Sequence, residues 1–112
     1  MYKLMAVDDE KAMCDVLADI IDWGELGVEF MGYSTNGYDA YEKALKWQPD
    51  IIMTDIKMPG MNGIELMKRL TEAGLQSRFL LLFSYAEFEY AREAMKYNVK
   101  VQFRRTLHDA KK

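Results

Sequence analysis

The sequence predicts a doubly wound α/β domain, in which a mostly parallel sheet has helices on both faces. Short apolar runs alternate with segments of helical periodicity along the chain, as expected for right-handed βαβ crossovers. The runs are apolar at successive positions, which is typical of strands buried on both faces. The 112 residues are enough for one domain with a single core. We therefore expect one α/β domain.

Five strands are predicted from apolar runs bounded by turn residues. They span residues 3–7, 28–34, 51–54, 79–83 and 100–103. The fourth run, FLLLF, is apolar throughout and predicts a fully buried strand. The fifth run, KVQF, is the weakest because it mixes polar and apolar residues.

Four helices are predicted between these strands from apolar residues at a helical period. The first has its apolar stripe at Met13, Val16, Leu17, Ile20 and Ile21, and a turn region follows at 22–27. The second spans about 38–47, with Asn36-Gly37 as its cap and Pro49 as its stop. The third carries Ile64, Met67 and Leu70 and ends near Gly74, and the fourth carries Phe88, Ala91, Ala94 and Met95.

The predicted sheet has five strands but only four predicted helices. Residues 106–112 are too few and too polar to cover a sheet face. Either the chain is shortened at this end, or a second molecule covers the face. We therefore expect a homodimer or an exposed apolar sheet face.

Composition narrows the class of protein. Fifteen Lys+Arg against eighteen Asp+Glu give a formal net charge of −3, which offers no electrostatic case for binding nucleic acid or an anionic membrane. The single cysteine, Cys14, excludes an internal disulfide and favours a reducing compartment. No apolar run approaches the roughly 18 residues of a transmembrane helix. We expect a cytoplasmic protein with no membrane association.

Three carboxylates follow the ends of predicted strands. Asp8 and Asp9 come after the first strand, and Asp55 comes after the third. In an open α/β sheet, ligands bind beyond the carboxyl ends of strands, where the strand order reverses. With the order 2-1-3-4-5 the three acids converge there, and a hard divalent cation such as Mg2+ relieves their repulsion. Taken singly, Asp9 is equally suited to a helix N-cap and Asp55 to the start of a turn.

Three longer segments carry a resemblance to a known family: AVDDEKA, PDIIMTDIKMPGMNGIELM and FSYAEFEYAREAMKYNV. They resemble the receiver domain of bacterial two-component response regulators. The segments DIIDWGELGVEFMG and EFEYAREAM are most similar to receivers that precede an AraC-type helix-turn-helix output. The resemblance runs without gaps from about Tyr2 to Leu107, so it implies a receiver domain at 1–107 and a truncated tail at 108–112. It implies the flavodoxin-like (CheY-like) fold, with a parallel sheet of order 2-1-3-4-5 and the fifth helix truncated or missing.

The resemblance also implies a function. Asp55 would be the phosphoacceptor, with Asp8, Asp9, Asp55 and the backbone carbonyl of Lys57 holding Mg2+. The Asp55 carboxylate would attack a phosphohistidine of a sensor histidine kinase, or a small phosphodonor, to form an acyl phosphate. The chain would be a signalling domain that catalyses at most its own phosphorylation and dephosphorylation. It would regulate transcription, and contact DNA, only through an output domain absent from this sequence.

The sequence departs from the family pattern at the positions that report phosphorylation. The family has a Ser or Thr at the end of the fourth strand that hydrogen-bonds the phosphoryl group, and this position falls on Phe83. The neighbouring Ser84 replaces it only if the strand end shifts. The family's aromatic switch residue falls on Gln102. Its phosphate-binding Lys falls on Arg105, and the Pro that follows falls on Thr106. Arg105 and Ser84 are the remaining candidates for binding the phosphoryl group.

Two other functions are considered, and the departures at Phe83, Gln102 and Thr106 motivate the first of them. One is a pseudo-receiver, a protein–protein interaction module with an impaired phosphorylation switch. The other is a haloacid-dehalogenase-type phosphatase that uses Asp55 as nucleophile. The second requires another aspartate two residues after Asp55, where this sequence has Lys57, so the receiver function is favoured.

Overall fold

The structure is a computed structural model that describes residues 1–83, 87, 89 and 92 and the backbone of 100–103. Five strands form one sheet: β1 (Tyr2–Val7), β2 (Val28–Ser34), β3 (Ile51–Asp55), β4 (Arg78–Leu82) and β5 (Lys100–Phe103). The helices of this part are α1 (Lys11–Asp19), α2 (Gly37–Trp47) and α3 (Gly63–Glu72), with a 3-10 turn, η1 (Gly24–Leu26).

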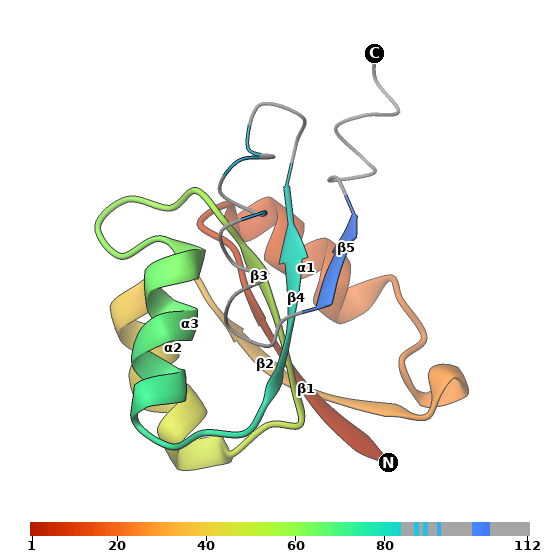
Figure 1. Cartoon of the computed structure of the whole chain (residues 1–112). Helices are drawn as coiled ribbons and strands as arrows, with labels where there is room; N and C mark the ends of the chain where they lie inside the picture. Colours follow the sequence, from red (N-terminus) through yellow and green to blue (C-terminus); the bar gives the residue numbers. More distant parts are fainter. Residues whose placement is uncertain (84–86, 88, 90–91, 93–99, 104–112) are drawn as a thin grey trace.

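All pairs of neighbouring strands are parallel, and their order is β2-β1-β3-β4-β5 (Figure 1). This confirms the predicted doubly wound sheet and its strand order. The chain reverses its direction of winding between β1 and β3, which are neighbours. Because Val7 pairs with both Ser34 and Thr54, the carboxyl ends of three strands lie together at one edge.

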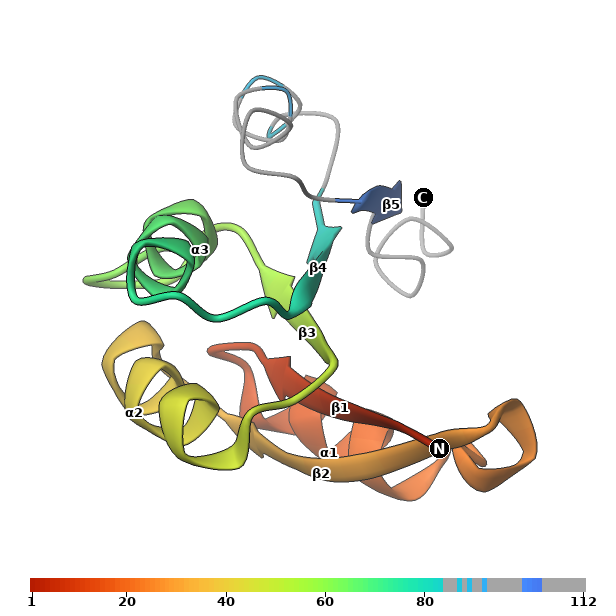
Figure 2. The same ribbon diagram turned by 60° about the horizontal axis from the view of Figure 1, so that its bottom comes forward.

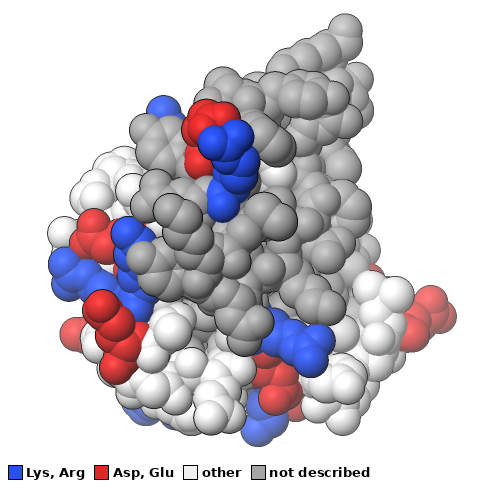
Figure 3. Space-filling model, viewed as in Figure 1, with Lys and Arg blue, Asp and Glu red and all other residues white. Residues whose placement is uncertain are grey.

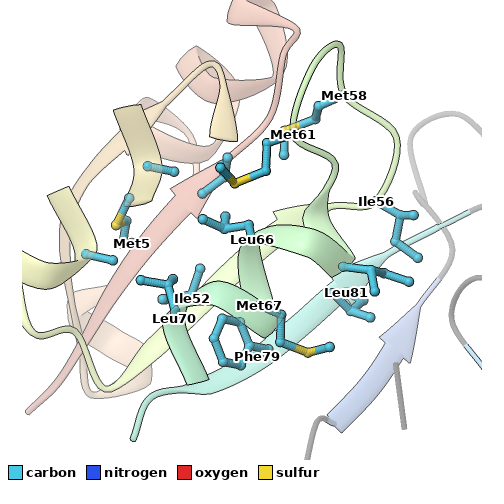
Figure 4. Packing of buried hydrophobic residues seen from close by; sticks show 14 of the residues in the cluster. Met5, Ile52, Ile56, Met58, Met61, Leu66, Met67, Leu70, Phe79 and Leu81 are labelled. Atoms are coloured by element: carbon cyan, nitrogen blue, oxygen red, sulfur yellow. The ribbon is translucent and has the colours of Figure 1, made fainter. Parts of the chain in front are cut away.

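The two faces of the sheet are covered differently. Helices α2 and α3 lie together on one face, and α1 lies on the other against β1 and β2 (Figure 2). The main hydrophobic cluster fills the space between the sheet and the α2–α3 layer. From the strands, Ile52, Phe79 and Leu81 lie beside Leu66, Met67 and Leu70 of α3 (Figure 4), and Met5 belongs to the same cluster.

The face of β3 and β4 that points away from this cluster keeps apolar side chains in partial contact with solvent. Alternate positions on the two strands, Ile51, Met53, Leu80 and Leu82, are only half-buried, whereas Ile52 and Leu81 are fully buried. Of the helices in the described ranges, α1 is the one on this side, and it packs on β1 and β2. An exposed apolar sheet face and the homodimer both stay predictions, because residues 104–112 lie outside the described residues.

The first helix is shorter than its apolar stripe predicted. It ends at Asp19, and Ile20 is 73% exposed rather than packed on the sheet. The buried residues of α1 are Cys14 and Leu17. The indole Nε1 of Trp23 donates to the main-chain oxygen of Leu17 at 2.7 Å, so a residue beyond the helix takes up one of its last carbonyls. The helix therefore ends before Ile20 can extend the buried stripe.

Asparagine side chains begin both helices of the α2–α3 layer. The side chain of Asn36 accepts a hydrogen bond from the N–H of Asp39 at 2.8 Å, which confirms the predicted cap of α2. Asn62 caps α3 in the same way, through the N–H of Glu65 at 2.8 Å. Each cap satisfies a donor that the helix itself leaves without a partner.

Several predictions fall on residues that the structure does not describe. The fourth predicted helix lies almost wholly outside the described residues. Residues 104–112, for which the sequence predicted a truncated fifth helix and a tail, also lie outside them. Within the described ranges, no helix is both long and apolar enough to cross a bilayer.

Charges of opposite sign lie side by side on the surface of α2 and α3 (Figure 3). Lys43 pairs with Asp39 at 2.9 Å, and Arg69 pairs with Glu65 at 2.8 Å, each one helical turn apart. These pairs are partly exposed and contribute little to stability.

Candidate functional site

Three carboxylates meet at the carboxyl edge of the sheet. Oxygen atoms of Asp8, Asp9 and Asp55 all lie within 4.8 Å of one another. Asp55 is the last residue of β3, and Asp8 and Asp9 follow β1, the neighbouring strand. The predicted convergence of these acids is therefore present. Asp8 and Asp55 are 0% and 1% exposed, whereas Asp9 is exposed.

Asp8 is held by contacts from three directions. Its N–H donates to the oxygen of Ser34 at the end of β2 at 3.1 Å. Its side-chain Oδ1 accepts from the N–H of Glu10 at 2.9 Å, and its main-chain oxygen accepts from the thiol of Cys14 in α1 at 3.3 Å. Asp8 is therefore hydrogen-bonded to β2, to α1 and to the loop that follows β1.

Asp55 is fixed through its main chain. The hydroxyl of Thr54 donates to the carbonyl oxygen of Asp55 at 2.9 Å. Gly63, the first residue of α3, lies so close that a β-carbon there would be 2.2 Å from the same oxygen. The N–H of Gly63 donates to the oxygen of Ile56 at 2.7 Å. The start of α3 thus rests directly on the backbone of Asp55 and Ile56.

The loop between β3 and α3 is anchored by buried side chains and by α2. Ile56, Met58 and Met61 are buried in the hydrophobic cluster. Gly60 has φ 77°, and a β-carbon there would be 3.0 Å from the ring of Tyr38 in α2. Lys57 lies in this loop, two residues after Asp55, with its side chain exposed. The predicted Lys57 carbonyl ligand therefore belongs to a loop whose neighbouring residues are packed.

A polar network supports the end of β2 beside Asp8. The hydroxyl of Ser34 donates to Oδ2 of Asp39 at 2.5 Å, and Lys43 pairs with the same oxygen at 2.9 Å. The hydrogen bond from Ser34, and after it the one from Lys43, lowers the pKa of Asp39. The sequence indicated only the helix cap at Asn36-Gly37 in this segment, so this network was missed.

Cys14 is a buried thiol next to the acids. Burial raises the pKa of Cys14 to about 11, so the group is protonated at neutral pH and can donate its hydrogen. From the sequence, this residue served only to exclude an internal disulfide and to favour a reducing compartment. Its spacing from Asp8 gave no sign of the contact, because that contact depends on how α1 packs on the sheet.

The three carboxylates fit a hard divalent cation. All the donor atoms are oxygens, which Mg2+ and Ca2+ prefer. In an octahedral site with ligands at about 2.1 Å, opposite ligands are separated by about 4.2 Å. Three ligands of one such ion lie about 3 to 4.2 Å apart, so the acid oxygens, within 4.8 Å of one another, are near the spacing that one ion requires. A cation would also offset the repulsion between two buried carboxylates.

The positions expected to report phosphorylation are only partly described. Phe83 is 8% exposed and belongs to the hydrophobic cluster, so it contributes packing and no hydroxyl. Gln102 lies in β5, where the structure gives the backbone alone. Ser84, Arg105 and Thr106 lie outside the described residues.

A protein family matches most of the sequence that carries this fold and these acids. Residues 4–107 match the response regulator receiver domain. The chain belongs to this family. A receiver domain is a signalling domain of two-component systems, and membership confirms the resemblance seen in the sequence.

Individual relatives of this receiver domain are transcriptional regulators. This chain is 48% identical over 100 residues to the uncharacterized transcriptional regulatory protein YesN of Bacillus subtilis. The match covers 89% of this chain but 27% of YesN, so the chain spans about a quarter of that relative's length.

Solved structures confirm the CheY-like fold. The receiver domain of AraT, a response regulator from Geobacillus stearothermophilus, superposes with a TM-score of 0.81 at 31% identity. A two-component transcriptional regulator AraC from Clostridium phytofermentans gives 0.81 at 29% identity. Each match covers 92% of this chain and 79% of the other. The expected relation to AraC-type regulators is thereby confirmed.

Proposed function

We propose that this receiver domain accepts a phosphoryl group on Asp55 in a reaction that depends on Mg2+. The convergence of Asp8, Asp9 and Asp55 at the switch point of the sheet carries the proposal. These acids, with the backbone carbonyl of Lys57, would hold the ion. When bound, the cation neutralises the charge of the acids and of the phosphoryl oxygens.

The chemistry is a nucleophilic substitution at phosphorus. A carboxylate oxygen of Asp55 attacks the phosphorus in line, the bond from phosphorus to the donor atom breaks, and an acyl phosphate forms. The role of the protein is chiefly to position the nucleophile. The close approach of Gly63 and the Thr54 hydrogen bond fix the backbone from which the Asp55 side chain extends.

The proposed phosphodonor is a sensor histidine kinase. Receiver domains of response regulators interact with such kinases, and the relative YesN is named a transcriptional regulatory protein. This chain, with its receiver domain at 1–107 and a tail at 108–112, would act in the cytoplasm as a homodimer. It would regulate transcription through a DNA-binding output domain outside this sequence. Arg105 and Ser84 are the proposed contacts to the phosphoryl group.

Mass spectrometry of the intact chain tests the acceptor. Incubation with Mg2+ and acetyl phosphate should add one phosphoryl mass, and chelation of the metal should prevent the addition. Asp55→Asn should remove it, whereas the matched control Asp19→Asn, an exposed acid at the end of α1, should leave it unchanged. No adduct on the unmodified chain would refute the proposal, as would an adduct that persists in Asp55→Asn.

A second candidate function is an interaction module whose phosphorylation switch is impaired, and the burial of Phe83 in the cluster favours it. A hydrogen bond to a charged group contributes roughly 1.5–3 kcal/mol. Shifting a two-state element from 1:99 to 99:1 takes about 5.5 kcal/mol. Loss of the family's hydroxyl therefore removes a large share of the switching free energy.

NMR distinguishes the two candidates. Beryllofluoride with Mg2+ mimics the phosphoryl group, and the amide shifts of residues 100–103 report on a distant strand. Shift changes that reach this strand support a working switch. Changes confined to the loops after β1 and β3 support the interaction module.

A further inference from the structure

The two buried acids share a feature that the proposed chemistry does not use. In each, the main-chain carbonyl accepts a hydrogen bond from a buried side chain: the Cys14 thiol to Asp8 at 3.3 Å, and the Thr54 hydroxyl to Asp55 at 2.9 Å. Both donors are 0% exposed. Their contacts are independent, because Cys14 comes from α1 and Thr54 from β3.

These hydrogen bonds act on the direction of the acid side chains. A carbonyl that is held in place fixes the rotation of its peptide plane, and this plane sets the direction of the adjoining Cα–Cβ bond. Asp8 and Asp55 bring like charges together, and repulsion favours rotating them apart. Donors on the main chain hold the two Cα–Cβ bonds in place against that repulsion and do not themselves occupy a carboxylate oxygen, although Oδ1 of Asp8 accepts from the N–H of Glu10.

The contact of Cys14 also links two strands. Its sulfur lies 4.0 Å from the oxygen of Ser34, the same oxygen that accepts the N–H of Asp8. The thiol therefore sits where the ends of β1 and β2 meet the start of α1. Removing it would leave the buried Asp8 carbonyl without this donor, and an incompletely satisfied buried group raises the free energy of the native arrangement.

We propose that Cys14 and Thr54 are positioning residues that preorganise Asp8 and Asp55 for a divalent cation. The inference rests on the proposed function, since it assumes that these acids bind the metal. It goes beyond that function by proposing that two side chains, which do not contact the ion, determine the positions of the acids that bind it.

Binding of Mn2+ alone provides a test that does not depend on phosphoryl transfer. The electron paramagnetic resonance signal of free Mn2+ gives its dissociation constant for the whole chain. Thr54→Val removes the hydroxyl with little change in shape, and Cys14→Ala removes the thiol. Each should weaken Mn2+ binding about 2- to 10-fold, the range expected for one hydrogen bond. Thr54→Ser and Cys14→Ser keep a donor and should retain most of the affinity.

Ile52→Val is the matched control for a purely structural effect. Ile52 is fully buried on β3, two residues before Thr54 and on the same face, so its truncation lowers stability without removing a donor. Urea unfolding of every variant measures that loss. We expect Ile52→Val to bind Mn2+ as the unmodified chain does, even where its stability falls as far as that of Thr54→Val.

The outcomes separate this inference from the proposed function. Absence of Mn2+ and Mg2+ binding by the unmodified chain overturns the metal site, and the inference with it. Normal binding by that chain, with unchanged affinity in Thr54→Val and Cys14→Ala, overturns the inference alone. Equal weakening in Ile52→Val also overturns it, because general loss of stability then explains the effect. If Cys14→Ala does not fold, the Mn2+ affinities of the Thr54 variants and of Cys14→Ser test the inference in the same way: an unchanged affinity in Thr54→Val overturns it.

Discussion

Replacing Gly63 with alanine tests whether α3 rests directly on the backbone of the proposed acceptor. The added β-carbon would lie 2.2 Å from the oxygen of Asp55 and 3.2 Å from Cα of Ile56. To reach the 3.0 Å below which real contacts essentially do not occur, the two segments must separate by about 0.8 Å. Both partners are backbone atoms, so no side-chain rotation relieves the contact.

The cost follows from this displacement. Overpacking a well-packed region costs roughly 1–3 kcal/mol. The hydrogen bond from the Gly63 N–H to Ile56, now 2.7 Å, would lengthen as the helix moves. Alanine is the better helix former by up to about 1 kcal/mol, which offsets part of the loss. We therefore expect Gly63→Ala to lower the free energy of unfolding by roughly 1–2 kcal/mol and to weaken Mn2+ binding.

Urea unfolding and Mn2+ titration measure the two effects, and two glycines serve as controls. A β-carbon at Gly24 would meet nothing closer than a side-chain oxygen at 3.6 Å, so Gly24→Ala should change stability by no more than about 0.5 kcal/mol. At Gly37 the contact is 2.7 Å, with the oxygen of Met61. Gly37→Ala should thus destabilise the fold but weaken Mn2+ binding less than Gly63→Ala does. A Gly63→Ala variant with unmodified stability and affinity would refute the reasoning.

Three further predictions follow from the same part of the structure. Asn62→Ala should lower the free energy of unfolding by about 1 kcal/mol in urea titrations, because it removes the cap of α3, whereas Asn62→Ser should keep most of it. The pKa of Asp39 is lowered in the folded chain, so its contribution to stability is present above its ordinary pKa and is lost as pH falls below about 4. Ser34→Ala should make acid unfolding less steep in that range; an unchanged acid limb would contradict the assigned cause. Sedimentation velocity should show self-association that Leu80→Lys abolishes, and a monomeric unmodified chain would rule out the homodimer.

The fold was predictable because its signals are local in the sequence. Apolar runs separated by helical periods specify parallel strands, and acids placed at two strand ends specify where a ligand site forms. The Asn36 cap was predictable for the same reason, since a cap and its helix are adjacent in the chain. The end of α1 was not predictable from the sequence, because it depends on the hydrogen bond from Trp23 back to Leu17. That contact requires the turn at η1 to be folded already.

The supporting contacts of the site were hidden for a similar reason. Gly63 appears in the sequence as part of a loop, and nothing in its neighbours shows that its missing side chain makes room for Asp55. Thr54 resembles any β-branched residue in a strand. Cys14 lies in a helix six residues beyond Asp8, and only the packing of α1 brings its sulfur to that residue's carbonyl. Such contacts depend on tertiary packing, and a single sequence specifies them only through the completed fold.

The structure therefore separates two requirements of a receiver domain. Accepting a phosphoryl group requires acids at fixed positions, and here Asp8 and Asp55 are buried and held through their main chains. Reporting phosphorylation requires a side chain that forms a new hydrogen bond when the phosphoryl group is attached. Phe83 belongs to the same hydrophobic cluster as Ile56 and Met58 of the loop after Asp55, so it is connected to that loop through the apolar core. Packing resists displacement but lacks the directionality of a hydrogen bond. Any signal passing through Phe83 must then arise from movement of the loop itself, rather than from a new bond to the phosphoryl group.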